Sequence, residues 1–263
     1  MHVDGERGRA RATARGALGT LAQGGAEELG PGASSRARPA GVEALDRRIA
    51  SERVWLDLLA LRFVTHPAFS RVFAEFLTGV YHSMRTAGAV MEAARLRSVA
   101  LAPECPVAAR LVGYWEDHMR DEAGHDAWLL ADLRDGFGID PERDLGLPPP
   151  EIAELMGTLH FWVLHTHPVA ALAYFYVVER SAASARMLDF MAESAGIPRD
   201  AMRTLYRHAE IDVAHGRELE ELVDGLPLTA AHHELLALSA TTVVRQLTRH
   251  MERMIGRADE VMA

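Results

Sequence analysis

The sequence contains one cysteine, no lysine and no long apolar run. Cys105 is the only cysteine among 263 residues, which excludes intramolecular disulfides, four-cysteine zinc sites and cysteine-ligated iron–sulfur clusters. All 28 basic residues are arginine, so no lysine can form the Schiff base that pyridoxal phosphate chemistry requires. A chain with a single cysteine is typical of a reducing cytoplasm, which is the location we expect.

The composition also argues against membranes and nucleic acids as partners. No stretch approaches the roughly 20 apolar residues of a membrane span, and the N-terminus lacks the apolar segment of a secretory signal. The net charge is −9, without a broad basic excess that would favour nucleic acid. Hydrophobic residues make up 49% of the chain, which is enough for a sizeable core.

The chain divides into a polar N-terminal segment and a helical remainder. Residues 1–40 are rich in Gly, Ala, Arg and Ser and have almost no large apolar side chain, so we expect a disordered tail. An organelle transit peptide is the alternative for this basic segment. Residues 41–263 are expected to form a single helical domain.

From about Val42 onward, apolar residues recur with helical spacing and no strand-like alternation appears. Prolines and glycines separate the helical stretches, as at His66-Pro67 and in the Gly/Pro-rich loop 135–150. The expected helices cover residues 42–64, 68–98, 105–135, 151–166, 168–195, 199–224 and 229–261. Seven long helices joined by short loops predict one all-α bundle.

Two eight-residue segments share the pattern of a histidine, three residues, a carboxylate, two residues and a histidine. The first octad is HMRDEAGH at 118–125, and the second is HAEIDVAH at 208–215. A helix turns about 100° per residue, so Glu122 lies about 40° and His125 about 20° from His118. The three side chains therefore share one helix face. The corresponding residues of the second octad are His208, Asp212 and His215.

These octads have the composition of metal ligands. Burying a carboxylate is unfavourable unless it is paired or bound to a metal, and iron, manganese and zinc accept imidazole and carboxylate ligands. Di-iron helix bundles use Glu-x-x-His pairs, of which Glu122–His125 is one and Asp212–His215 the aspartate analogue. The alternative is two helices with solvated His/acid faces, but chance rarely places two such octads in one chain.

A lone acid interrupts the most apolar segment, VAALAYFYVVERSAAS at 169–184. As a ligand, Glu179 brings the set to three carboxylates and four imidazoles, which suits two divalent ions. The alternative is a core acid paired with an arginine. In the second predicted helix, His82 and Glu92 are possible additional ligands, and ordinary core or surface roles are the alternative for both.

Three segments resemble the haem-oxygenase-like di-iron oxidases and oxygenases, a family also labelled iron-containing redox enzymes. The segments are HMRDEAGHDAWLLADL, HPVAALAYFYVVERSAAS and HAEIDVAHGRELEELVD, which with their spacing span most of 110–224. The specific part is the second octad, preceded about thirty residues earlier by the lone Glu179. The resemblance implies a seven-helix haem-oxygenase-like bundle and two iron ions that activate O₂, manganese or zinc being less expected. The implied ligands are Glu122, His125, Glu179, His208, Asp212 and His215.

One position departs from the family pattern. The family commonly takes another carboxylate from the first half of the bundle, whereas His118 occupies that ligand face here. Either His118 is itself a ligand or Glu92 supplies the missing oxygen. Glu179 is expected to be the mobile, catalytic ligand, which bridges or shifts as the metals change charge.

The implied function is O₂-dependent oxidation of a small molecule, by N-hydroxylation, oxidative decarboxylation or C–C cleavage. An external electron donor and a homodimer are further expectations. Three alternatives stay open: a metal-binding protein without turnover, a metal-free thiaminase-like member of the fold, and a zinc hydrolase.

Several further residues are candidates for the surroundings of the metals. Arg180 is a candidate for binding a substrate carboxylate, with a structural salt bridge as the alternative. We expect Trp128 in the core, and Asp132 at the surface or hydrogen-bonded behind a ligand. Plain core packing is the alternative for the candidate pocket residues, which are Met91, Phe161, Trp162, Tyr174 and Tyr176.

Overall fold

The computed structural model describes residues 40–263, which are helices and connecting loops without a β-strand. The all-α prediction is confirmed for this part of the chain. The expected disordered tail lies outside the described residues, except for Ala40. The α-helices are α2 (Ala40–Val64), α3 (Phe69–Leu101), α4 (Pro106–Asp121), α5 (His125–Phe137), α6 (Pro141–Asp144), α7 (Pro150–His165), α8 (Leu172–Glu179), α9 (Ala185–Ala195), α10 (Arg203–Gly225) and α11 (Ala230–Met262). Two 3₁₀ helices precede α8 and α10: η1 (Pro168–Ala171) and η2 (Arg199–Met202).

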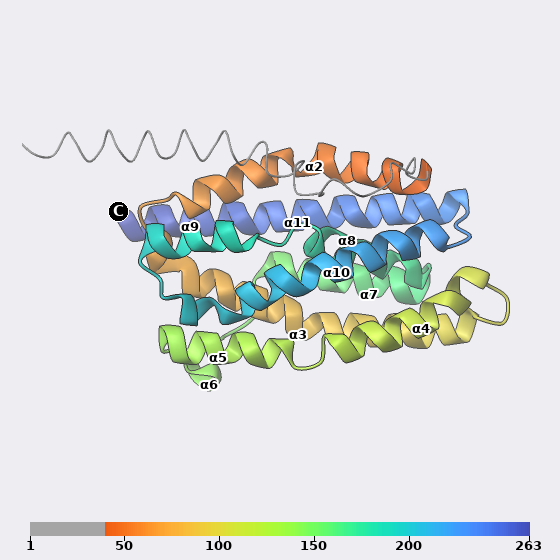
Figure 1. Ribbon diagram of the computed structural model, residues 1–263, viewed down its shortest axis with the longest axis horizontal. Coiled ribbons are helices and arrows are strands. Elements are labelled where there is room, and N and C mark those ends of the chain that lie inside the picture. Colours follow the sequence, from red (N-terminus) through yellow and green to blue (C-terminus); the bar gives the residue numbers. More distant parts are fainter. Residues whose placement is uncertain (1–39) are drawn as a thin grey trace, which may run out of the picture. The chain divides into compact units, whose positions relative to one another are not determined.

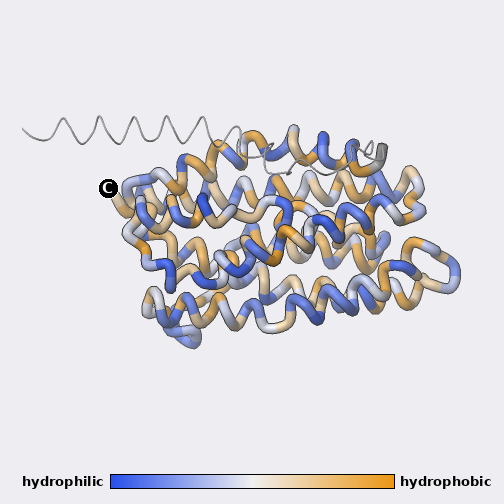
Figure 2. Tube along the Cα trace, in the orientation of Figure 1, coloured by the Kyte–Doolittle hydropathy of each residue, from blue (hydrophilic) through white to orange (hydrophobic). Residues whose placement is uncertain are grey.

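Most helix ends lie where proline and capping residues predict them. Pro106 is the first residue of α4, and the Cys105 side chain before it accepts the backbone N–H of Ala108. Pro150 likewise begins α7. The long helices carry alternating hydrophilic and hydrophobic residues, as Figure 2 shows, so each buries one side. No helix within 40–263 combines the length and apolar character needed to cross a membrane.

The predicted continuous helices over 105–135 and 168–195 are wrong, because the first is divided into α4 and α5 and the second into η1, α8 and α9, so the described residues form more than the seven expected helices. The first breaks between α4 and α5, where Gly124 adopts a left-handed φ of 86° that interrupts the helix and is the N-cap of α5. The second breaks after α8, and Ser184 begins α9 by accepting the backbone N–H of Met187. No proline marks either break.

The two breaks divide the bundle into two apolar cores. One core contains α4 and α8, with Leu111, Trp115 and Leu172 buried in it. The other contains α5 and α9, with Leu133 and Leu188 buried in it. The long helices α2, α3, α10 and α11 run past both cores (Figure 1). The ends of α4 and α8 therefore carry polar side chains to the junction between the cores.

Candidate metal centre

Six predicted ligands form two clusters at this junction. In each cluster, three ligand atoms lie within 4.8 Å of one another. The His118 cluster comprises His118, Glu179 and His215, and the His208 cluster comprises Glu122, His125 and His208. The two octads and the lone acid of α8 thus meet in space, although α8 lies far from each octad in the sequence.

The His118 cluster is fully buried. His118 lies in the last turn of α4, Glu179 ends α8, and His215 lies in the middle of α10. His118 Nε2 is 3.1 Å from Glu179 Oε1, and the ring centroids of His118 and His215 are 5.1 Å apart. This cluster includes His118 and not Glu92, so it is His118 that lies beside Glu179.

The His208 cluster joins α5 to α10 across the first helix break. His125 Nδ1 donates a hydrogen bond to Glu122 Oε2 at 3.1 Å, and His208 Nδ1 donates to Asp212 Oδ1 at 3.0 Å. Asp212 is buried beside this cluster without being one of its three members. Because Nδ1 of His208 donates its hydrogen bond to Asp212, the lone pair of Nε2 is free to bind a cation. Histidines oriented by a carboxylate have the same arrangement at metal sites.

Glu122 is the residue that connects the clusters. Its Oε1 atom lies 3.5 Å from Nδ1 of His215, while its Oε2 atom accepts from His125. This position follows from the helix break, since Glu122 is the C-cap of α4 and not an interior residue of a helix. Glu122, rather than Glu179, therefore has oxygens facing both clusters.

The carboxylates and imidazoles of the clusters perturb one another. Burial opposes ionisation of Glu122, but the His125 hydrogen bond and the nearby imidazoles outweigh it and lower its pKa. Burial raises the pKa of Glu179 despite its contact with His118. For His118, burial is outweighed by Glu179 and the pKa is raised. The pKa of His208 is also raised, because Asp212 outweighs its burial.

Several buried polar atoms of the clusters lack a hydrogen-bond partner among the described residues. These atoms are His118 Nε2, Glu179 Oε2, His208 Nε2 and His215 Nδ1. The approach of His118 to Glu179 meets the distance of an ion pair but not the angles of a hydrogen bond. Unsatisfied imidazole and carboxylate atoms facing one another inside a bundle fit a pair of divalent cations.

Aromatic side chains pack on the ligand rings. Trp128 stacks on His125 with centroids 4.1 Å apart, and the guanidinium of Arg207 covers the Trp128 ring. Trp128 is thus partly buried against a ligand. Tyr114 stacks on His118 at 5.2 Å, and its hydroxyl is buried without a hydrogen-bond partner among residues 40–263. The sequence analysis missed Tyr114, although its spacing of four residues from His118 places both on one helix face.

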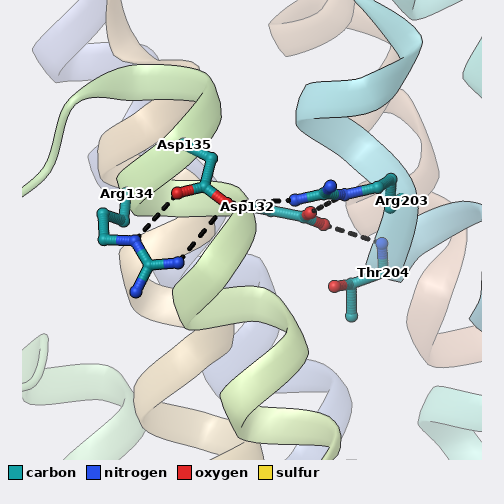
Figure 3. Close-up of polar contacts among 5 residues, drawn as sticks. All are labelled: Asp132, Arg134, Asp135, Arg203 and Thr204. Atoms are coloured by element: carbon teal, nitrogen blue, oxygen red, sulfur yellow. Dashed lines mark hydrogen bonds and ion pairs between the residues drawn. The ribbon is translucent and has the colours of Figure 1, made fainter.

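Asp132 fixes the orientation of the two ligand-bearing helices α5 and α10. Its side chain is 1% exposed and accepts hydrogen bonds from Arg203 Nε at 2.9 Å and Thr204 N at 2.7 Å. Figure 3 shows that these bonds reach from α5 to the start of α10, while Asp135 pairs with Arg134 on α5. The surface position considered for Asp132 is wrong, because the carboxylate is buried and caps α10.

The possible additional ligands lie outside both clusters. His82 Nε2 is 3.3 Å from the carbonyl oxygen of Leu145. Glu92 forms a bidentate pair with Arg95, at 2.7 and 2.9 Å, and its side chain is 41% exposed. The structure therefore brings neither residue to the metal ligands.

The candidate pocket residues are spread over different environments. Phe161 is 58% exposed, and Met91 is packed in an apolar core. Trp162 is partly buried against the same core. The Tyr174 hydroxyl contacts Ser83 at 2.8 Å, and burial raises the pKa of Tyr174 to about 12. Of these residues, Tyr174 is affected by the cluster carboxylates, because the charges of Glu122 and Glu179 contribute to its shift.

Tyr176 and Arg180 belong to a separate polar network. The Tyr176 hydroxyl donates to Asp46 at 2.8 Å and accepts from Arg180. Arg180 also pairs with Asp46 and Glu220. These contacts correspond to the salt bridge considered as the alternative for Arg180.

Comparison with known proteins identifies a family and a fold. A family model described as "iron-containing redox enzyme" matches residues 74–247, which is more than half of the chain. Among proteins with curated descriptions, none matches.

Several solved structures share the fold at low sequence identity. A domain of unknown function with a haem-oxygenase-like fold from Shewanella denitrificans is 18% identical, with a TM-score of 0.69, covering 84% of this chain and 95% of that one. A TenA homologue from Pseudomonas syringae is 16% identical, with a TM-score of 0.66 and coverages of 83% and 94%. A CADD-like protein of unknown function from Nostoc punctiforme is 13% identical, with a TM-score of 0.59 and coverages of 82% and 98%. The likeness confirms the predicted haem-oxygenase-like fold.

Proposed function

Since the chain belongs to the family of iron-containing redox enzymes, we propose that it binds two iron ions and uses them to activate O₂ for oxidation of a small molecule. The observation that carries this proposal is the pair of buried clusters joined by Glu122. Two adjacent sites that share a carboxylate suit a pair of ions better than a single one.

Each ion has its own set of protein ligands in this proposal. His118, Glu179 and His215 would hold one ion, and Glu122, His125 and His208 would hold the other. Asp212 keeps the His208 ring turned so that Nε2 faces the ion. Glu122, Glu179 and Asp212 together carry three negative charges, which balance most of the charge of two divalent cations.

The bound iron pair would supply the electrons that reduce O₂ and the oxidising power for the substrate. The chain's own side chains hold and shield this centre. Glu122 has one oxygen near His125 and the other near His215, so its negative charge would act on both ions. The Oε2 atom of Glu179 has no hydrogen-bond partner among the described residues. Rotation of the carboxylate therefore breaks no hydrogen bond at this oxygen. The low exposure of His118, Glu179 and His215 excludes bulk water from one side of the centre.

The metal-free alternative receives less support from these clusters. A metal-free protein would leave four buried polar atoms of the two sites without partners, which is unfavourable. The two clusters offer two carboxylates and four imidazoles, with the carboxylate of Asp212 beside them, and this is a donor set that iron accepts. The likeness to a TenA homologue concerns the fold alone.

Anaerobic loading with Fe(II), followed by mixing with O₂ in a stopped-flow spectrophotometer, tests the proposal. We expect about two irons per chain, by the two-cluster geometry, and a transient visible absorption after mixing. His215→Ala removes a ligand of the His118 cluster, so it should bind less iron and lose the absorption. His233→Ala, a change at an exposed histidine outside both clusters, is the matched control. Absence of stoichiometric iron in the unsubstituted protein would contradict the proposal.

A further inference from the structure

A third cluster of metal-ligating side chains lies at the start of α4, away from both iron clusters. The sulfur of Cys105 and one nitrogen each of His167 and His232 lie within 4.8 Å of one another. The cysteine precedes α4, and His118 lies near its other end. At 1.5 Å per residue, the two positions are about 20 Å apart along the helix axis. The third cluster is therefore a separate site.

The distances within this cluster suit a tetrahedral ion. Cys105 Sγ lies 3.4 Å from His167 Nε2, and the ring centroids of His167 and His232 are 4.5 Å apart. Zinc–sulfur and zinc–nitrogen bonds of ordinary length place the two ligand atoms about 3.6 Å apart in a tetrahedral site. A metal ion would therefore need only small adjustments of these side chains.

Each of the three side chains is held in place by the backbone at the start of a helix. Cys105 Sγ accepts the N–H of Ala108 at 3.5 Å. His167 Nδ1 accepts the N–H of Val169 at 3.1 Å. His232 Nδ1 accepts the N–H of Thr229 at 3.2 Å, within a capping box at the start of α11. Three segments that are distant in the sequence thus place these side chains at one point.

The surroundings of both imidazoles lower their pKa. Burial, followed by the nearby His232 and Arg97, lowers the pKa of His167 to about 4. Burial and the neighbouring His233 also lower the pKa of His232. Protons therefore compete weakly with a cation for these rings.

We propose that Cys105, His167 and His232 form a binding site for Zn²⁺. One thiolate and two imidazoles are ligands that this closed-shell, thiophilic ion accepts in tetrahedral geometry. All three residues are partly exposed, so water can fill the fourth position. The site joins the starts of α4, η1 and α11, and the bound ion stabilises the fold at that point.

The existing hydrogen bonds set an expectation for the affinity. Because His167 Nδ1 accepts a backbone N–H, the neutral ring carries its proton on Nε2, the nitrogen nearest the sulfur. An ion at Nε2 shifts that proton to Nδ1, which can then no longer accept the N–H of Val169, so this hydrogen bond is lost. The proposed site therefore binds Zn²⁺ less tightly than a site whose rings donate from Nδ1 to an acceptor.

Cobalt(II) substitution provides a direct test, because a thiolate bound to Co²⁺ gives a charge-transfer band in the near ultraviolet. Cys105 is the only cysteine of the chain, so the band can arise at no other residue. We expect the band in the metal-free full chain titrated with Co²⁺ and its loss on addition of Zn²⁺. Absence of the band at saturating Co²⁺ would overturn the proposal, whatever the outcome of iron loading.

Three substitutions keep the helix caps while removing one ligand each, so that loss of binding is separable from loss of folding. Cys105→Ser, His167→Asn and His232→Gln retain side-chain acceptors suited to their caps. Cys105→Ser should abolish the band, and His167→Asn and His232→Gln should weaken Co²⁺ binding at least tenfold. Glu142→Ala, at an exposed position of α6, should leave it unchanged. Unchanged binding in both histidine variants would overturn the three-residue site.

Zn²⁺ should also raise the melting temperature of the unsubstituted chain more than that of Cys105→Ser, in which only the other two clusters can still bind the ion.

Discussion

The two octads have identical spacing but lie on different backbones. HAEIDVAH lies within the continuous helix α10, so its three polar side chains share one face as the spacing predicts. HMRDEAGH crosses the break between α4 and α5, so its residues do not lie on one helix. Both octads nevertheless place their side chains at the same centre. The same spacing therefore occurs both within a continuous helix and across a helix break, and the surrounding fold determines which of the two is formed.

The break changes what the middle carboxylate can reach. Asp212, on a regular helix, accepts a hydrogen bond from His208 one turn before it. Glu122, at the end of α4, faces His125 of its own octad and His215 of the other. The irregular octad thus supplies the connecting carboxylate, while the regular one supplies a carboxylate that orients a histidine.

The largest difference between the two octads is expected in iron binding, when the middle carboxylate of each is replaced by its amide. Glu122→Gln removes the negative charge shared by both sites, so we expect loss of stoichiometric binding of both ions. Asp212→Asn removes a partner of His208, and a fall of about 10- to 100-fold in affinity for one ion is expected. Anaerobic Fe(II) titration with a competing chromophoric chelator measures both results. Equal losses in the two variants would show that the carboxylates have equivalent roles.

The backbone of the first octad can be tested at Gly124. Its φ of 86° is unfavourable for residues with a side chain, although a Cβ there would meet no atom within 4 Å. Gly124→Ala should therefore lower the free energy of unfolding by about 1 kcal/mol through backbone strain. Gly124→Asn should lower it less, because asparagine tolerates the left-handed conformation better. Chemical denaturation measures both values, and a larger loss for asparagine would contradict the backbone explanation.

The smallest expected effect, on the pH dependence of stability, concerns His250, a buried histidine outside both octads. His250 has two buried ring nitrogens without hydrogen bonds, stacks on Phe76 and lies 4.0 Å from Glu151. Burial lowers its pKa, and Arg253 adds to this, although Glu151 and Glu75 act in the opposite direction. The octad histidines His118 and His208 have raised pKa values instead, because each has a carboxylate in contact.

The sign of the pH effect follows from the lowered pKa of His250. The unfolded chain binds a proton at His250 below about pH 6.5, whereas the folded chain does not until a lower pH. Stability from this residue is therefore present above that pH and lost as the pH falls below it. His250→Leu should reduce the loss of unfolding free energy between about pH 7 and pH 5. His233→Ala, at an exposed position, should leave the pH profile unchanged.

Much of the fold follows from local signals in the sequence. The helix ends at Pro67, Pro106 and Pro150 were predictable because proline disfavours continuation of a helix. The breaks at Gly124 and after Glu179 were missed, since one depends on a glycine that helices also tolerate and the other on packing between two cores.

The candidate site was predictable where polar residues interrupt an apolar pattern. Glu179 was identified as the only acid in its apolar segment, and it lies with His118 and His215. Spacing alone did not distinguish His118 from Glu92, because the choice depends on which helix faces α8. The Cys105–His167–His232 cluster was missed altogether, since its members belong to three distant segments without a shared motif.

The pairing of α2 with α11 has a consequence for the order of folding. The two helices run parallel, with Arg48 bonded to Thr241 and Trp55 to Glu252, contacts that span 193 and 197 residues (Figure 1). Closing such long loops is slow compared with forming local contacts. During synthesis, α2 leaves the ribosome long before its partner exists, so its apolar side stays uncovered until the last helix emerges. A chaperone that shields α2 during this interval would raise the yield of native protein.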